Sequence, residues 1–202
     1  RMIKKKMSFY ALEAILRNLS VWLQAYSPHI RAAAIKYDYV SFATRENQEY
    51  FSKHYGRRGE IISDQGLDLN HTSETYNTPS HSLRVVWAGS LTARKNVDAL
   101  IDIISLADKD IHFTIMGDGP KAAKIKLLAQ RNNNVTFLGH APRTQVVDVL
   151  RQAQVHLLTS MSEANTAILL EAIEANCIPI APKINGFPSL LGKDYPYLIP
   201  KS

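Results

Sequence analysis

From residue 83 onward the sequence predicts an α/β fold, a Rossmann-like parallel sheet with helices on both faces. A strand–helix alternation repeats five times in this part of the chain. Its apolar runs are rich in Val, Ile and Leu and have no polar face, which is typical of strands covered on both sides. Helical crossovers between such strands require a parallel sheet wound right-handedly.

Each element is predicted from its own pattern. The strands are expected at Arg84–Ala88, Ile111–Met116, Val135–Leu138, Val155–Leu158 and Ile178–Ala181. Asn96 is placed to cap the first helix. The apolar face of that helix would be Val97, Leu100, Ile101 and Ile104. The other helices are expected near Lys121–Gln130, Thr144–Ala153 and Thr166–Ala175.

Residues 1–68 predict a remnant of another domain, and the polar residues 69–82 predict a linker. The expected elements are a basic helical stretch (3–26), a helix at Pro28–Lys36, a strand at Tyr39–Ala43, a helix with Tyr50, Phe51 and Tyr55, and a strand at Glu60–Ser63. Two strands are too few for an independent doubly wound domain. Because the chain stops at Ser202, after a strand-like run at 197–199, we expect truncation at both ends.

Composition places the chain among soluble globular proteins, with 46% hydrophobic and 21% charged residues. No apolar run approaches the roughly 18 to 20 residues that span a bilayer. Glu13 and Arg17 interrupt the only signal-like segment, so we expect a cytoplasmic protein. Cys177 is the only cysteine, which excludes an internal disulfide, and its apolar surroundings predict a buried hydrophobe.

The net charge of +6 belongs to the first 60 residues, because acids and bases balance in the rest. Nucleic acid and an anionic membrane surface are the candidate partners of such a segment. The neutral remainder and the lack of a recognition motif argue against nucleic acid. We expect the basic helix to pack on its own domain, with a peripheral contact at the inner face of the membrane as the alternative.

Ligands of parallel α/β sheets bind beyond the carboxyl ends of the strands, so the loops there are the candidate site. After the first strand, Gly89 and Ser90 permit a close turn, and Arg94 and Lys95 precede a helix start. Cations beside free helix amides suit a phosphate. The alternative is a solvated basic loop.

The loop after the second strand, Gly117-Asp118-Gly119-Pro120, has two interpretations. One is a plain tight turn that leads into a helix. The other is a dinucleotide fingerprint formed with Ala122. The fingerprint needs an acidic residue near the end of the next strand. Residues 137–141 hold none, which argues against nicotinamide binding.

The loop after the fourth strand runs from 159 to 166 and leads into a helix, with Glu163 and Glu171 eight residues apart. Helix amides near Asn165 and Thr166 would then point at a ligand between two carboxylates. This arrangement suits a sugar diphosphate, because carboxylates accept hydroxyl hydrogen bonds and amides hold the anion. The alternative is two unrelated surface glutamates.

Together these segments resemble the retaining glycosyltransferases of family 4, which have the two-domain GT-B architecture. The resemblance covers about residues 38–202 and is strongest over 84–188. It rests jointly on Gly89 to Lys95, on 113–120, on 135–139 and on 160–179, which contains the E-x7-E motif as Glu163 and Glu171. Residues 83–202 would be the donor-binding domain, incomplete at its C-terminus, and 1–68 a remnant of the acceptor-side domain.

The resemblance implies a role for each site residue. Lys95 would hold the donor diphosphate and Glu163 the hydroxyls of the transferred sugar, and these two would be catalytic. Glu171 would bind the ribose. Gly89, Ser90, Arg94 and Gly117 would form the binding loops, amides near Asn165 and Thr166 would contact sugar or phosphate, and Leu138 and Gly139 would line the base. No metal or other cofactor is expected, because Lys95 and amides balance the departing charge.

The implied function is transfer of a sugar from a nucleoside diphosphate, with retention, to a glycan or lipid-linked acceptor in polysaccharide or envelope synthesis. Ser90 departs from the family's usual Arg, for which Arg94 would compensate. The family's N-terminal glycine-rich loop and usual histidine region are missing, so we expect donor binding without turnover. The alternative is a non-catalytic nucleotide-sugar-binding module. Asp108-Lys109-Asp110 spells a metal motif but precedes a strand, away from the expected site.

Overall fold

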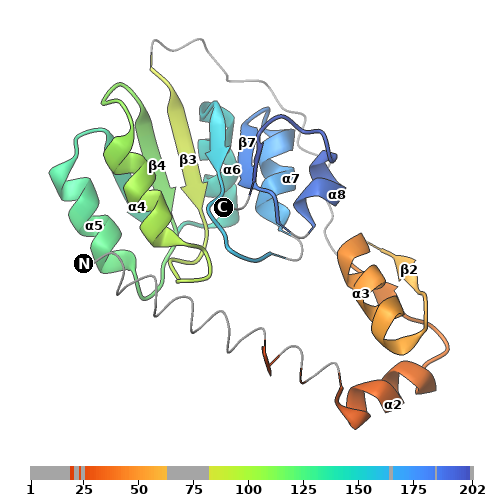
Figure 1. Ribbon diagram of the computed structural model, residues 1–202. Helices are drawn as coiled ribbons and strands as arrows, with labels where there is room; N and C mark the ends of the chain where they lie inside the picture. The colour runs from red at the N-terminus through yellow and green to blue at the C-terminus, as the bar shows by residue number, and fades with distance from the viewer. Residues whose placement is uncertain are drawn as a thin grey trace. The chain divides into compact units, whose positions relative to one another are not determined.

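The computed structural model describes residues 19–20, 23, 26–62, 82–163, 166–184 and 186–200. Contacts divide the chain into two compact units, residues 1–62 and 63–202 (Figure 1). Most of the predicted basic helix and nearly all of the predicted linker fall outside the described residues. None of the helices among the described residues combines the length and the hydrophobicity that a membrane span requires.

The smaller unit contains the four elements that the sequence predicts between residues 28 and 63. They are α2 (Pro28–Lys36), β1 (Ser41–Phe42), α3 (Arg45–Tyr55) and β2 (Glu60–Ile61), and the two short strands pair in parallel. The Thr44 hydroxyl caps α3 by accepting a hydrogen bond from the Asn47 amide at 3.3 Å. Phe42 packs on Phe51, with ring centroids 5.1 Å apart.

The larger unit is built on a parallel sheet with strand order β5-β4-β3-β6-β7-β8. The strands are β3 (Arg84–Ala88), β4 (His112–Met116), β5 (Val135–Gly139), β6 (Val155–Leu157), β7 (Ile178–Pro182) and β8 (Leu198–Ile199). All five predicted strands are present, and the strand-like run near 197 forms β8. Chain order reverses between β3 and β6, which makes the edge beside these two strands a topological switch point.

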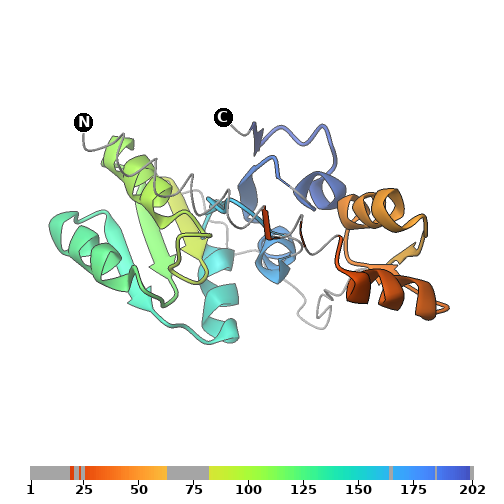
Figure 2. The same cartoon turned by 60° about the horizontal axis from the view of Figure 1, so that its bottom comes forward.

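Helices cover both faces of this sheet, as predicted (Figures 1 and 2). They are α4 (Val97–Leu106), α5 (Ala122–Arg131), α6 (Arg143–Gln152), α7 (Ala167–Glu174) and the short α8 (Phe187–Leu191), which the sequence analysis did not predict. On one face Leu100 of α4 and Ile125 of α5 are buried in one hydrophobic cluster with Trp87 of β3. On the other face Leu150 of α6 and Ala172 of α7 belong to a cluster with Val86.

The prediction that the Asn96 side chain caps α4 is wrong. Asn96 does occupy the N-cap position, but its backbone is left-handed with φ 52°, and its side chain makes no capping hydrogen bond. A capping side chain needs extended backbone at this position, which the tight turn before α4 does not provide. The α4 face is otherwise as expected, with Val97, Leu100 and Ile104 buried and Ile101 partly buried.

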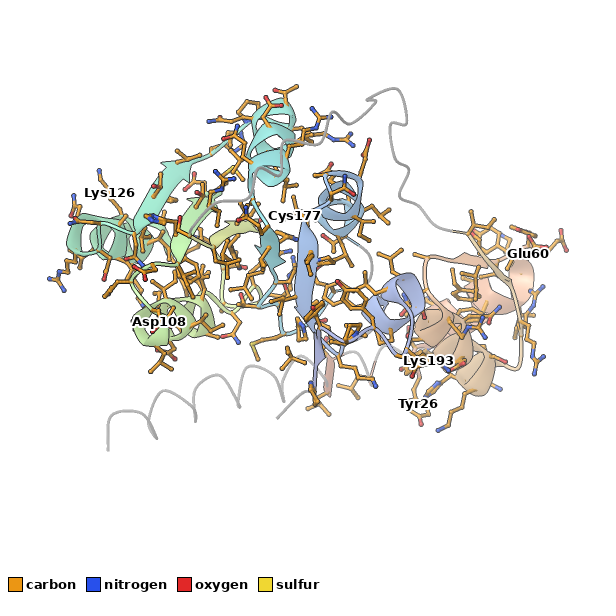
Figure 3. All side chains as sticks on the ribbon, turned by 90° about the horizontal axis from the view of Figure 1, so that it is seen from above. Tyr26, Glu60, Asp108, Lys126, Cys177 and Lys193 are labelled. Carbon is orange, nitrogen blue, oxygen red and sulfur yellow. The ribbon has the colours of Figure 1, made fainter. Side chains whose placement is uncertain are left out.

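Cys177 precedes β7 and is buried, with 1% of its surface exposed (Figure 3). Burial raises the pKa of its thiol to about 12. The residue therefore stays a neutral thiol at physiological pH and packs as a small apolar side chain, in agreement with the prediction.

Candidate functional site

A cavity of about 510 Å³ lies at the carboxyl edge of the sheet, at the switch point. Its size falls within the range of roughly 300 to 1,000 Å³ that is usual for small-molecule sites. Its lining residues come from the end of β3 and its loop (Ala88, Gly89, Ser90, Arg94, Lys95), the end of β4 (Met116, Gly117), the segment before and within α6 (His140, Ala141, Arg143, Val146), and the start of α7 (Thr166, Ala167, Ile168, Glu171).

Close contact between two loops fixes the floor of this cavity. The Gly117 amide donates to the Gly139 carbonyl at 2.7 Å, and the Gly89 amide donates to the Met116 carbonyl at 3.0 Å. A Cβ at Gly117 would lie 1.9 Å from the Gly89 carbonyl oxygen, and its φ of 138° also favours glycine. The glycines that suggested a dinucleotide fingerprint are therefore needed for packing between the β3 and β4 loops.

Lys95 and Glu163 meet although they come from different loops. Lys95 Nζ lies 2.6 Å from Glu163 Oε1, and Arg94 NH1 lies 3.0 Å from the same oxygen. Burial alone would raise the pKa of the Glu163 carboxyl. Lys95, with smaller effects from Ser160 and Arg94, outweighs burial and lowers this pKa below its ordinary value. Glu163 is thus a buried, ionised carboxylate.

Further hydrogen bonds hold the β3 loop against the β6 loop. The Thr159 hydroxyl donates to the Lys95 carbonyl at 2.7 Å and accepts from Trp87 Nε1 at 3.0 Å. The Met161 amide donates to the Arg94 carbonyl at 2.9 Å. Because these bonds fix the backbone on both sides of the ion pair, the positions of Lys95 and Glu163 are set by the fold itself.

Glu171 lies in α7 with 7% of its surface exposed. Its Oε1 forms a salt bridge with the Arg143 guanidinium, whose Nε lies 2.8 Å away. Both residues line the cavity. The alternative of two unrelated surface glutamates is therefore wrong, since Glu163 and Glu171 are both buried beside cations at the same edge of the sheet.

The amino end of α7 also faces the cavity. Thr166 is its N-cap and makes no side-chain capping bond, and Ala167 and Ile168 line the cavity beside it. The first amides of a helix have no intrahelical acceptor and carry a partial positive charge. Asn165, which the sequence places next to them, lies outside the described residues.

Most of the predicted site residues line the cavity, namely Gly89, Ser90, Arg94, Lys95, Gly117, Thr166 and Glu171. Glu163 is not among the lining residues but pairs with Lys95, which is. Leu138 and Gly139 lie in β5 and are not among the lining residues, so their contact with a base stays a prediction. Asp108 and Asp110 lie before the amino end of β4, at the edge opposite the cavity, as predicted.

Sequence reasoning missed Arg143 and His156. Arg143 begins α6 just after the β5 loop, so its place at the carboxyl edge was a usable signal. His156 points from β6 into the interior and is fully buried, and neither ring nitrogen has a hydrogen-bond partner among the described residues. Burial, together with the charge of Lys95, lowers the pKa of His156 to about 3, so this ring is neutral.

The family assignment rests on the larger unit of the chain. A family model described as "Glycosyl transferases group 1" matches residues 71–202, which include every residue of the cavity. The chain belongs to this family. The chain is similar to the phosphatidylinositol N-acetylglucosaminyltransferase GPI3 subunit of Saccharomyces cerevisiae, with 32% identity over 138 residues. That match covers 65% of this chain and 30% of the relative, so the chain spans only a part of the relative's length.

Solved structures show the same fold. The apo form of the lipopolysaccharide outer core galactosyltransferase WaaB superposes with a TM-score of 0.67 at 19% identity, over 82% of this chain and 48% of that one. HepE of Anabaena in complex with UDP-glucose superposes with a TM-score of 0.61 at 20% identity, over 75% and 46% of the two chains. At these identities the likeness establishes the GT-B fold alone.

Proposed function

We propose that this chain binds the donor of a retaining glycosyltransferase, a nucleoside diphosphate sugar, in the cavity at the switch point. One observation carries the proposal. Lys95, the amino end of α7 and Glu171 converge on one cavity of a size that suits a nucleotide sugar. The family supports this choice, and HepE, which has the same fold, was solved with UDP-glucose.

The diphosphate is assigned to the cationic part of the cavity. Lys95, Arg94 and the first amides of α7 supply positive charge from two directions. The same groups would stabilise the charge that develops on the diphosphate as the sugar leaves, so the proposed transfer needs no metal. Lys95 is accordingly proposed as a catalytic residue.

The hydroxyl groups are assigned to the two buried carboxylates. Glu171 lines the cavity and would accept hydrogen bonds from the ribose. Glu163 pairs with both Lys95 and Arg94 in this structure. A bound diphosphate would share those cations, which would allow Glu163 to accept hydroxyl hydrogen bonds from the transferred sugar. Asn165 and Thr166 would contact the donor nearby, and Leu138 and Gly139 would lie toward the base.

The acceptor is proposed to be a glycan or a lipid-linked molecule at the cytoplasmic face of a membrane. The yeast relative's name specifies transfer to phosphatidylinositol, and the basic residues near the N-terminus would favour an anionic surface. We propose that the 202-residue chain binds donor without turnover. The alternative, a non-catalytic nucleotide-sugar-binding module, would be supported by the absence of transfer in the intact gene product.

Calorimetric titration of the chain with UDP-, GDP- and ADP-sugars tests the proposal. One of the three is expected to bind, with the corresponding free nucleoside diphosphate as a competitor. Lack of binding by all three would contradict it. Thermal shift measured in parallel confirms that each protein sample is folded.

A further inference from the structure

Arg143 is a charged residue at the cavity to which the family resemblance assigns no role. It begins α6, lines the cavity, and pairs through Nε with Glu171 Oε1 at 2.8 Å. The two side chains differ in exposure, because 63% of the Arg143 side chain is accessible and only 8% of the Glu171 side chain. A nearly buried carboxylate is therefore paired with a cation at the cavity wall, across the contact between α6 and α7.

This pair differs from an ordinary surface ion pair. Exposed pairs add little, because both charges remain solvated when they separate. Glu171 is instead shielded from water, so loss of its cation would leave a buried charge without compensation. The carboxylate would then turn toward water, and its orientation at the cavity would change.

The pairing with Arg143 leaves Glu171 free to accept hydrogen bonds from ligand hydroxyl groups. A carboxylate has about four acceptor positions on its two oxygens, so one oxygen held by Arg143 leaves the other to accept hydroxyl groups. The contact with Arg143 Nε holds Oε1 of Glu171 at the cavity wall and so restricts the rotation of the carboxylate. Arg143 also offsets the negative charge of Glu171, which would otherwise repel a diphosphate in the same cavity.

We propose that Arg143 is a positioning residue that orients Glu171 toward the ribose hydroxyls and thereby makes the site selective for ribonucleotides. The inference rests on the proposed function, since it names a specificity determinant of the same site. Arg143 acts through Glu171, so its removal reduces hydroxyl selectivity more than it reduces affinity for a nucleotide that lacks those hydroxyls.

The test compares ribose with dideoxyribose nucleotides. UDP, GDP and ADP are titrated against the wild-type chain, and the tightest is compared with its 2′,3′-dideoxy counterpart. We expect a preference of about tenfold or more for the ribonucleotide, the size of one or two hydrogen bonds to a charged group. Arg143→Ala is expected to reduce the preference to less than about threefold, and Arg143→Lys, which keeps the positive charge without the planar guanidinium, to restore only part of it.

Two further variants separate positioning from general damage. Arg151→Ala removes another arginine of α6, one that pairs with Asp148 at 3.6 Å, and should leave the preference unchanged. In a Glu171→Gln background, Arg143→Ala should cause no further loss, because the two residues act as one unit. A full preference in Arg143→Ala overturns the inference while leaving the proposed function intact. Failure of all three nucleotides to bind the wild-type chain overturns both.

Discussion

Lys95 Nζ lies 2.6 Å from Glu163 Oε1, so the cation proposed to hold phosphate is paired with an acid of the protein itself. The pair is held by two loops that follow the neighbouring strands β3 and β6, and the hydrogen bond from Thr159 to the Lys95 carbonyl fixes their contact. A diphosphate must therefore share Lys95 with Glu163 rather than meet an isolated charge.

Replacing Lys95 by alanine should weaken binding of the nucleoside diphosphate sugar. The loss should be about 1 to 3 kcal/mol, the size of a hydrogen bond to a charged group. Calorimetric titration measures it. Lys109→Ala removes a lysine before β4, at the opposite edge of the sheet, and should leave affinity unchanged. Equal affinities in wild type and Lys95→Ala would remove Lys95 from the donor site.

Glu171→Gln keeps the shape of the side chain but removes its charge. We expect donor affinity to fall by about 1 to 3 kcal/mol, because an amide is a weaker acceptor for hydroxyl groups than a carboxylate. Glu174→Gln is the matched control, since Glu174 lies on the same helix and does not line the cavity. If both variants bind the donor as the wild type does, Glu171 has no contact with it.

The sequence predicted the sheet well because each strand is a continuous apolar run, and burial on both faces leaves little ambiguity. It placed Lys95 and Glu171 at one edge because parallel strands all end there. It could not predict that Arg143 pairs with Glu171, since the contact depends on how α6 packs on α7. It also could not predict that Glu163 is paired with Lys95, because spacing along the chain does not determine which loops meet.

Gly117→Ala tests whether the loops require glycine for packing. The new Cβ would lie 1.9 Å from the Gly89 carbonyl oxygen, so backbone must move. We expect the free energy of unfolding to fall by more than about 3 kcal/mol, from overpacking and backbone strain together. Gly192→Ala, where φ is 94° and no atom lies within 4 Å, should cost only the backbone strain, about 1 to 3 kcal/mol. Equal losses in denaturant titration would contradict the packing argument.

His156 makes stability dependent on pH. Its pKa is lowered from 6.5 to about 3 in the folded chain, so between these values the unfolded state binds the extra proton. The stabilisation is complete above pH 6.5 and is lost as pH falls toward 3. His156→Leu should remove a slope approaching about 1.4 kcal/mol per pH unit in that window. Denaturant titrations at several pH values measure it, and parallel curves for both proteins would refute a buried neutral histidine.

A crystal structure of the chain with its bound nucleoside diphosphate sugar tests the central claim most directly. The account predicts the diphosphate beside Lys95 and the first amides of α7, with the ribose against Glu171. A nucleotide bound elsewhere on the sheet, or one with neither residue in contact, would contradict it.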